Sequence, residues 1–107
     1  MTSETGILFE RRGVAGCVIL NRPQALNAVS HGMVLALTRK LVEWETDPTI
    51  TRVVVTANGG RAFSAGGDLR ALYDLGRAGR YEEALDFFRA EYALNTRIKY
   101  YRKPYVR

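Results

Sequence analysis

The sequence has little that forms covalent cross-links or binds a metal, since its 107 residues include one cysteine and one histidine. Cys17 has no second thiol to pair with, which excludes an internal disulfide. His31 lies near no cluster of cysteines or carboxylates, so we expect no metal site. No apolar run is long enough to span a membrane, and we expect no membrane partner. The first six residues lack both a basic stretch and an apolar stretch, which favours a cytoplasmic protein without a leader peptide.

Acidic residues are absent after Glu91, and this absence accounts for the formal net charge of +5. The segment 97–107 contains five basic residues, whereas the eleven basic residues before it balance the eleven acidic ones. Nucleic-acid-binding domains usually spread basic residues along a face or stripe. Positive charge gathered at one end of the chain therefore does not predict a nucleic-acid partner.

Hydrophobic residues make up 47% and charged residues 25% of the chain, which is typical of a globular domain. Apolar patterning predicts strands over 6–12 and 14–20, with a tight link at Gly13, and a further strand over 52–57. Ser30 is a suitable N-cap for a helix that ends near Trp44 or Glu45. One apolar stripe of that helix consists of Met33, Leu37, Leu41 and Trp44.

The second half of the chain predicts two more helices and the start of a strand. A short helix, with Asp68 as a possible cap, extends to about residue 75, and a longer helix covers about 80–101. The apolar stripe of the longer helix is Tyr81, Leu85, Phe88 and Tyr92. Residues 103–106 resemble the beginning of a strand. Alternation of strands and helices predicts an α/β layered fold, and we expect 1–107 to be the N-terminal portion of a single larger domain.

The segment 62–70 has the composition of a site at which backbone amides contact a ligand. Small residues and the adjacent Gly66 and Gly67 lie between a strand and the start of a helix. Such a backbone can approach a ligand closely, and the N–H groups at a helix N-terminus stabilise developing negative charge. This is one half of an oxyanion hole. The alternative is a tight turn in which a larger side chain would clash.

Glu91 is the second candidate. On a helical wheel it lies near Ala84, Phe88, Asn95 and Ile98, at the edge of the apolar face, and no basic residue stands three or four positions away. Asp86 with Arg89, and Glu83 with Arg80, are spaced instead as surface ion pairs. A carboxylate without a local partner needs a distant partner or faces a cavity. The alternative is a glutamate at the rim of the helix, in water.

Taken together, three stretches resemble signatures of the crotonase superfamily, also called the enoyl-CoA hydratase/isomerase family. They are residues 20–28 (LNRPQALNA), 62–69 (AFSAGGDL) and 103–106 (KPYV). Within that superfamily, residues 87–95 (FFRAEYALN) and 44–48 (WETDP) are similar to the branch of 3-hydroxyisobutyryl-CoA hydrolases, the thioesterases of valine breakdown. The resemblance implies a superhelix of strand-strand-helix repeats.

The resemblance also implies an acyl-CoA thioester as substrate, with no separate cofactor because CoA is part of the substrate. Gly67 matches the residue whose N–H is the first oxyanion donor, and Glu91 matches a glutamate that contacts the acyl group. Residues that match the CoA-binding positions are Gln24, Ala25, Leu26, Ala65, Gly66, Gly67, Asp68, Leu69 and Arg70. A full-length member would form a homo-oligomer, a trimer or hexamer.

The catalytic carboxylates and the second oxyanion glycine of the family lie beyond the position that matches Arg107. We therefore expect residues 1–107 alone to be inactive. Two alternatives to the hydrolase function remain at this stage. One is an enoyl-CoA hydratase or isomerase, and the other is a binding module without catalytic activity.

Overall fold

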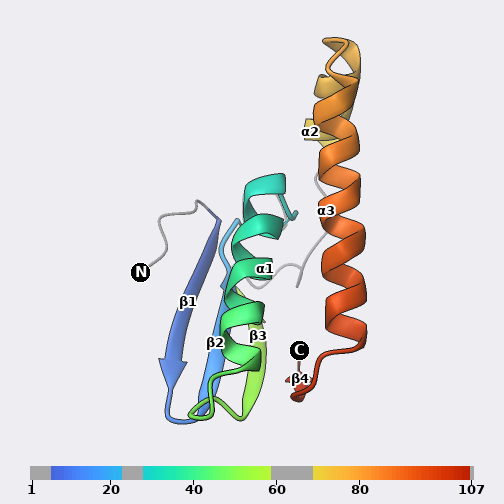
Figure 1. The fold of residues 1–107 in the computed structure, drawn as a ribbon. Coiled ribbons are helices and arrows are strands. Elements are labelled where there is room, and N and C mark those ends of the chain that lie inside the picture. The colour runs from blue at the N-terminus through green and yellow to red at the C-terminus, as the bar shows by residue number, and fades with distance from the viewer. Residues whose placement is uncertain (1–5, 23–27, 59–68, 107) are drawn as a thin grey trace.

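The computed structural model describes residues 6–22, 28–58 and 69–106, which form one four-stranded sheet and three helices (Figure 1). The α/β fold class predicted from the sequence is confirmed. The elements are β1 (Ile7–Arg12), β2 (Ala15–Leu20), α1 (His31–Glu45), β3 (Arg52–Ala57), α2 (Leu69–Arg77), α3 (Tyr81–Lys99) and β4 (Tyr105–Val106).

The sheet is mixed, with the strand order β1-β2-β3-β4. β1 and β2 form an antiparallel hairpin that closes with the pair Arg12 and Ala15. Gly13 in the connecting turn has φ +61°, a left-handed conformation that glycine adopts without steric cost, as the predicted tight link requires. β3 runs parallel to β2, and β4 runs parallel to β3. The carboxyl ends of β2 and β3 therefore lie at one edge of the sheet.

The first helix covers one face of this sheet, as its sequence pattern predicts. The Ser30 side chain accepts a hydrogen bond from the backbone N–H of Met33 at 3.2 Å, which confirms the expected N-cap. All four residues of the predicted apolar stripe are buried, and they pack against Ile7, Val18 and Val53 in one core. This packing fixes α1 across β1, β2 and β3 (Figure 1).

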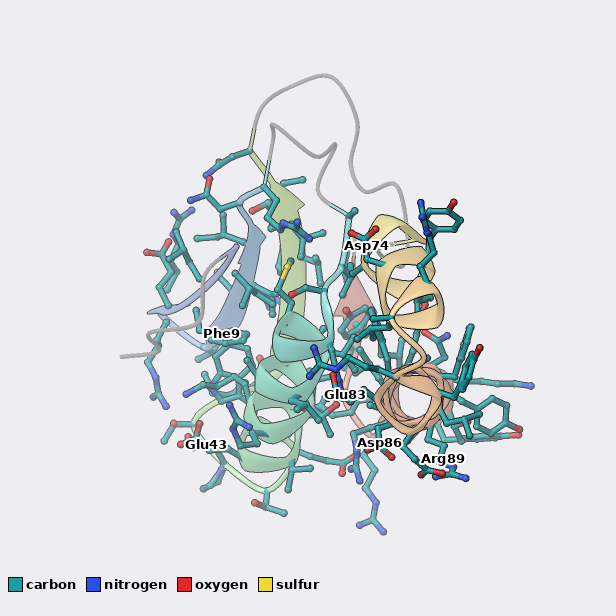
Figure 2. All side chains as sticks on the ribbon, turned by 90° about the horizontal axis from the view of Figure 1, so that it is seen from above. Phe9, Glu43, Asp74, Glu83, Asp86 and Arg89 are labelled. Carbon is teal, nitrogen blue, oxygen red and sulfur yellow. The ribbon has the colours of Figure 1, made fainter. Side chains whose placement is uncertain are left out.

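The predicted buried face of α3 is wrong. Tyr81, Leu85, Phe88 and Tyr92 remain 44–76% exposed, whereas Phe87 and Leu94 are buried and belong to the core. Ala84, Glu91 and Ile98 are half-buried on the same side of the helix. Both sets of residues recur at intervals of three and four, so apolar spacing alone does not distinguish them. The position of α1 determines which face of α3 is buried, because α3 packs beside α1 (Figure 2).

In the second half of the chain, the predicted boundaries of the two helices and the last strand agree with the structure within two residues. α2 ends at Arg77, and α3 spans Tyr81–Lys99. The predicted surface pairs of Arg80 with Glu83 and of Arg89 with Asp86 both form on α3. Among the described residues, no helix is both long and apolar enough to cross a membrane.

Candidate functional site

The candidate site begins at the carboxyl ends of two adjacent parallel strands, which is where open α/β sheets usually bind ligands. Asn21 follows β2 and Asn58 follows β3. The Asn58 side-chain amide donates a hydrogen bond to Oδ1 of Asn21 at 3.1 Å, and its backbone N–H donates to the carbonyl of Leu20 at 2.9 Å. The segment 23–27 follows shortly after the first asparagine, and the segment 59–68 follows the second. The fold thus brings the described ends of both family-like stretches together.

Arg22 holds the base of the first stretch. Its guanidinium Nη1 donates to the carbonyl of Ala28 at 2.8 Å and so joins the two described ends around residues 23–27. The arginine stem lies over Gly6, where an added Cβ would stand 2.6 Å from Arg22 Cγ and 2.9 Å from the sulfur of Met33. Gly6 also has φ +94°, so both space and backbone conformation favour glycine there. Sequence reasoning assigned no role to either residue.

Most of the residues expected to bind CoA lie outside the described residues. These are Gln24, Ala25, Leu26, Ala65, Gly66, Gly67 and Asp68. Leu69 and Arg70 are the first two residues of α2, so a helix does begin two positions after Gly67, as the sequence predicts. The oxyanion role of Gly67 and the CoA contacts of these residues stay predictions.

Glu91 lies on the side of α3 that packs against α1, one helical turn after Phe87 and one turn before Leu94. Phe87 is fully buried and stacks on the imidazole of His31, with ring centroids 5.3 Å apart and planes 6° from parallel. The expectation that Glu91 lies at the edge of a buried face is confirmed, although that face is not the predicted one. The Glu91 side chain makes no hydrogen bond or ion pair with any part of the chain that the structure describes.

The surroundings of Glu91 make it a candidate for substrate binding. A half-buried carboxylate that accepts no hydrogen bond from the described residues can accept one from a hydroxyl group of a bound ligand. His31 is the first residue of α1, so its stacking on Phe87 packs α3 against the start of that helix. The histidine has a packing role that sequence reasoning missed, because the partner ring is 56 residues away in the chain.

Across residues 6–22, 28–58 and 69–106, no group of three or more His, Cys, Asp and Glu residues forms a possible metal site.

The opposite end of α1 is fixed by a lysine whose role the sequence did not reveal. Lys103 Nζ donates hydrogen bonds to the carbonyls of Trp44, Asp47 and Ile50 at 2.5–2.6 Å. The carbonyl of Leu41 accepts a hydrogen bond from the hydroxyl of Tyr101 at 2.6 Å. These contacts join the end of α1 to the segment that enters β4. They hold the stretch 103–106 beside β3, where the family resemblance places a strand.

Two titratable groups at this end have shifted pKa values. Burial raises the pKa of the Tyr101 hydroxyl to about 12, with a further contribution from the negative charge of Glu45. Hydrogen bonds from the side chain and backbone of Thr49 lower the pKa of Asp47, and Arg11 adds a smaller effect. Both groups lie at the end of α1 opposite Ser30, so they stabilise the fold away from the candidate site.

An open hollow of about 500 Å³ also lies at this opposite end, beside the last turns of α3. Its lining includes Tyr92, Arg97, Tyr100 and Arg102. Glu45 also lines it and is paired with Arg97 at 3.5 Å. The hollow is therefore separate from the strand ends that carry the family-like stretches.

Comparisons with known proteins point to the same family as the three sequence stretches do. The sequence model of a family described as enoyl-CoA hydratase/isomerase matches residues 15–107. The chain is 50% identical over 99 residues to the mitochondrial 3-hydroxyisobutyryl-CoA hydrolase of Xenopus tropicalis, a match that covers 92% of this chain and 26% of that protein. The chain thus spans about a quarter of the length of this curated relative.

Two solved structures share the fold and a substantial part of the sequence. An enoyl-CoA hydratase from Rhodobacter sphaeroides superposes with a TM-score of 0.89 at 40% identity, covering 94% of this chain and 30% of that one. A carnitinyl-CoA dehydratase from Mycobacterium thermoresistibile superposes with a TM-score of 0.90 at 39% identity, covering 95% and 30%. The described strands and helices therefore match the corresponding part of each larger fold.

The comparisons correct one expectation from the sequence. A cytoplasmic location was expected from the composition of the first six residues, whereas the Xenopus tropicalis relative is a mitochondrial protein. So short a stretch does not determine location, and the cytoplasmic expectation is wrong.

Proposed function

The chain belongs to the enoyl-CoA hydratase/isomerase family, and on that premise we propose that it is the CoA-thioester-binding part of a 3-hydroxyisobutyryl-CoA hydrolase. The observation that carries the proposal is the 50% identity to such a hydrolase over almost the whole chain. The geometry supports it, because the ends of the two family-like stretches are joined at one edge of the sheet by Asn21 and Asn58.

The proposed reaction is hydrolysis of a thioester, in which water adds to the carbonyl carbon and CoA leaves as the thiol. Negative charge develops on the carbonyl oxygen as water adds. In this proposal the backbone N–H of Gly67 donates to that oxygen, and one such donor contributes about 3–4 kcal/mol to transition-state stabilisation. Residues 65–70 and 24–26 bind the CoA part, which positions the thioester against the donor.

Glu91 has a separate role in the proposal, which is recognition of the acyl group. Its carboxylate is half-buried on the α1-facing side of α3 and has no partner within the described chain. A 3-hydroxyacyl group carries a hydroxyl that can donate to such a carboxylate, whereas an enoyl group carries none. Discrimination between these two acyl groups therefore depends on Glu91.

Enoyl-CoA hydration is the second candidate function. It is favoured by the 40% identity to the Rhodobacter sphaeroides enoyl-CoA hydratase, which shares the fold over 94% of this chain. Hydration uses the same type of oxyanion donor, but it stabilises an enolate rather than a tetrahedral intermediate. The two functions differ in which acyl group Glu91 would help to bind.

Calorimetric titration of the chain with 3-hydroxyisobutyryl-CoA, crotonyl-CoA and free CoA tests the proposal. We expect the hydroxyacyl thioester to bind more tightly than the other two, and we expect Glu91→Gln to remove that preference while leaving free CoA affinity unchanged. Glu83→Gln is the matched control, because Glu83 lies on the same helix but pairs with Arg80 at the surface. Absence of binding to all three compounds would contradict the CoA proposal. Equal affinities for the two thioesters in the wild type would favour the hydratase.

A further inference from the structure

The imidazole of His31 joins the start of α1 to the first half of α3. It stacks on the ring of Phe87, with centroids 5.3 Å apart and planes 6° from parallel. Phe87 is 1% exposed and is the first buried residue of α3. Both rings belong to the described chain, so this contact does not depend on which residues cover the exposed side of α3.

The start of α1 holds His31 in a fixed position. Ser30 directly precedes it, and the Ser30 side chain accepts a hydrogen bond from the backbone N–H of Met33 at 3.2 Å. The Ser30 carbonyl accepts a second hydrogen bond from the N–H of Val34 at 3.0 Å. Met33 and Val34 are fully buried in the core beneath the helix. The backbone is therefore fixed on both sides of His31, and its ring provides a firm surface for Phe87.

Glu91 lies one helical turn after the stacked ring. Residues four positions apart share one side of a helix and are separated by about 6 Å along its axis. Glu91 is half-buried on that side, and the next buried residue, Leu94, follows three positions later. A displacement of Phe87 away from α1 would carry Glu91 with it, because the hydrogen bonds of one helical turn make the two residues move together.

The second contact between these two helices is too far from Glu91 to replace the stack. α1 and α3 run side by side in the same direction (Figure 1). Beyond the end of α3, the hydroxyl of Tyr101 donates a hydrogen bond to the carbonyl of Leu41 at 2.6 Å. Tyr101 follows Glu91 by ten residues, whereas Phe87 precedes it by four. The position of the carboxylate therefore depends mainly on the ring contact at His31.

We propose that His31 is a positioning residue for recognition of the acyl group, and that it acts through Phe87 on Glu91. The inference rests on the proposed function, in which the Glu91 carboxylate accepts a hydrogen bond from the hydroxyl of a 3-hydroxyacyl group. Hydrogen bonds weaken steeply when their geometry departs from the optimum, so a small shift of Glu91 reduces selectivity. The role requires a flat ring at position 31, which phenylalanine also supplies and alanine does not.

Calorimetric titration of the chain with 3-hydroxyisobutyryl-CoA and crotonyl-CoA measures its preference for the hydroxyacyl thioester. His31→Ala should reduce this preference at least about threefold, because the ring that holds Phe87 is lost. His31→Phe should restore the preference to within about twofold of the wild type, since it retains an aromatic pair. The affinity for free CoA should be the same in all three proteins, because free CoA carries no acyl group for Glu91 to bind.

A second background tests whether His31 acts through Glu91. In a Glu91→Gln chain, His31→Ala should reduce the preference no further, because residues that act in one chain of contacts have non-additive effects. A further reduction would show that the histidine affects the ligand by another route, and would overturn the proposal.

Tyr101→Phe is the matched control for a general loosening of the two helices. It removes the contact to Leu41, so it should lower the melting temperature while leaving the preference at the wild-type value. An equal loss of preference in Tyr101→Phe and His31→Ala would overturn the positioning role. His31→Ser, which also lacks a ring, is the second variant if His31→Ala alters the helix content measured by circular dichroism.

The wild-type titration separates this proposal from the proposed function. A wild-type chain that binds both thioesters equally would overturn the proposed function and the role of His31 with it. A wild-type preference that His31→Ala leaves unchanged would overturn the role of His31 alone, and recognition of the acyl group by Glu91 would stand without it.

Discussion

Gly16 lies directly beneath the indole ring of Trp44: a Cβ built on Gly16 would stand 2.6 Å from Trp44 Cε3. This close approach is where β2 supports the last turns of α1. Both residues are buried, and the neighbouring ring of Phe9 meets the indole edge-on with centroids 6.1 Å apart. The absence of a side chain at Gly16 therefore sets the separation between sheet and helix.

Gly16→Ala should destabilise the chain by about 1–3 kcal/mol, because either the indole or the helix must move to admit the methyl group. Urea unfolding followed by tryptophan fluorescence measures the change. Gly76→Ala is the matched control, since a Cβ at Gly76 meets nothing within 4 Å and the residue lies in α2. Alanine in a helix is favoured over glycine, so the control should be neutral or slightly stabilising. If both variants unfold at the same urea concentration, the close packing at Gly16 is not significant for stability.

The sequence predicted α1 well because the information for this helix is local. Ser30 caps the helix, and the apolar residues Met33, Leu37, Leu41 and Trp44 share one face. The opposite face has fewer apolar residues, Leu35 and Val42, which are 42% and 45% exposed. The face with the larger number of apolar residues is the one that is buried, so the pattern identifies it. β1, β2 and β3 were predicted to within one residue for a similar reason, since the continuous apolar run in β2 indicates a strand covered on both faces.

Residues that act through distant partners were not predictable in this way. The buried face of α3 depends on where α1 lies, because both faces of α3 carry apolar residues at the same spacing. The three carbonyls that Lys103 binds are 53–59 residues away in sequence, and nothing near Lys103 indicates them. For the candidate site, the sequence located the two CoA-binding stretches by resemblance, whereas the contact between Asn21 and Asn58 became visible only in three dimensions.

Lys103→Met should destabilise the chain by about 2–3 kcal/mol, because three partly buried carbonyls lose a charged donor. Methionine retains most of the apolar stem, so the change isolates the loss of hydrogen bonding. Urea unfolding gives the free energy of unfolding. Lys99→Met is the matched control, since Lys99 is exposed in the last turn of α3 and only approaches the ring of Tyr100. A destabilisation no larger than that of the control would show that water replaces the lysine at these carbonyls.

The raised pKa of the Tyr101 hydroxyl predicts that the folded chain loses stability at high pH. The pKa of its hydroxyl is raised to about 12 in the folded chain, from the ordinary value of 10.0. The folded state therefore holds this proton more tightly than the unfolded state does. The corresponding stabilisation is complete below pH 10 and decreases as the pH rises from 10 towards 12.

Tyr101→Phe should remove this part of the pH dependence, although it also removes the hydrogen bond to the carbonyl of Leu41. Urea midpoints measured at intervals between pH 9 and pH 12 give the slope of stability for each protein. We expect a shallower decline for Tyr101→Phe than for the wild type. All other ionisable groups are the same in both proteins, so the difference between the two slopes isolates Tyr101. Tyr100→Phe serves as the control, since Tyr100 is 70% exposed, and its slope should match the wild type. Identical slopes for all three proteins would contradict the raised pKa.

Glu91 links the fold to the proposed activity, and its substitution is best measured where turnover is possible. The matching segment of the Xenopus tropicalis hydrolase can be replaced by this chain, which is 50% identical to it. In that chimera, Glu91→Ala should lower kcat/KM for 3-hydroxyisobutyryl-CoA at least about tenfold, which corresponds to about 1.4 kcal/mol. A hydrogen bond to a charged group contributes about 1.5–3 kcal/mol, so this loss is consistent with one lost contact to the substrate hydroxyl.

The matched control is Glu83→Ala, which removes a carboxylate from the same helix at a position where it pairs with Arg80 in water. It should leave kcat/KM unchanged, because exposed ion pairs contribute little. Thermal unfolding of each chimera separates a loss of substrate binding from a loss of helix packing, since Glu91 lies between the buried residues Phe87 and Leu94. An unchanged melting temperature together with unchanged activity for Glu91→Ala would place Glu91 in solvent at the rim of α3. The hydrolase proposal would then lose its acyl-recognition residue, and the enoyl-CoA hydratase alternative would be preferred.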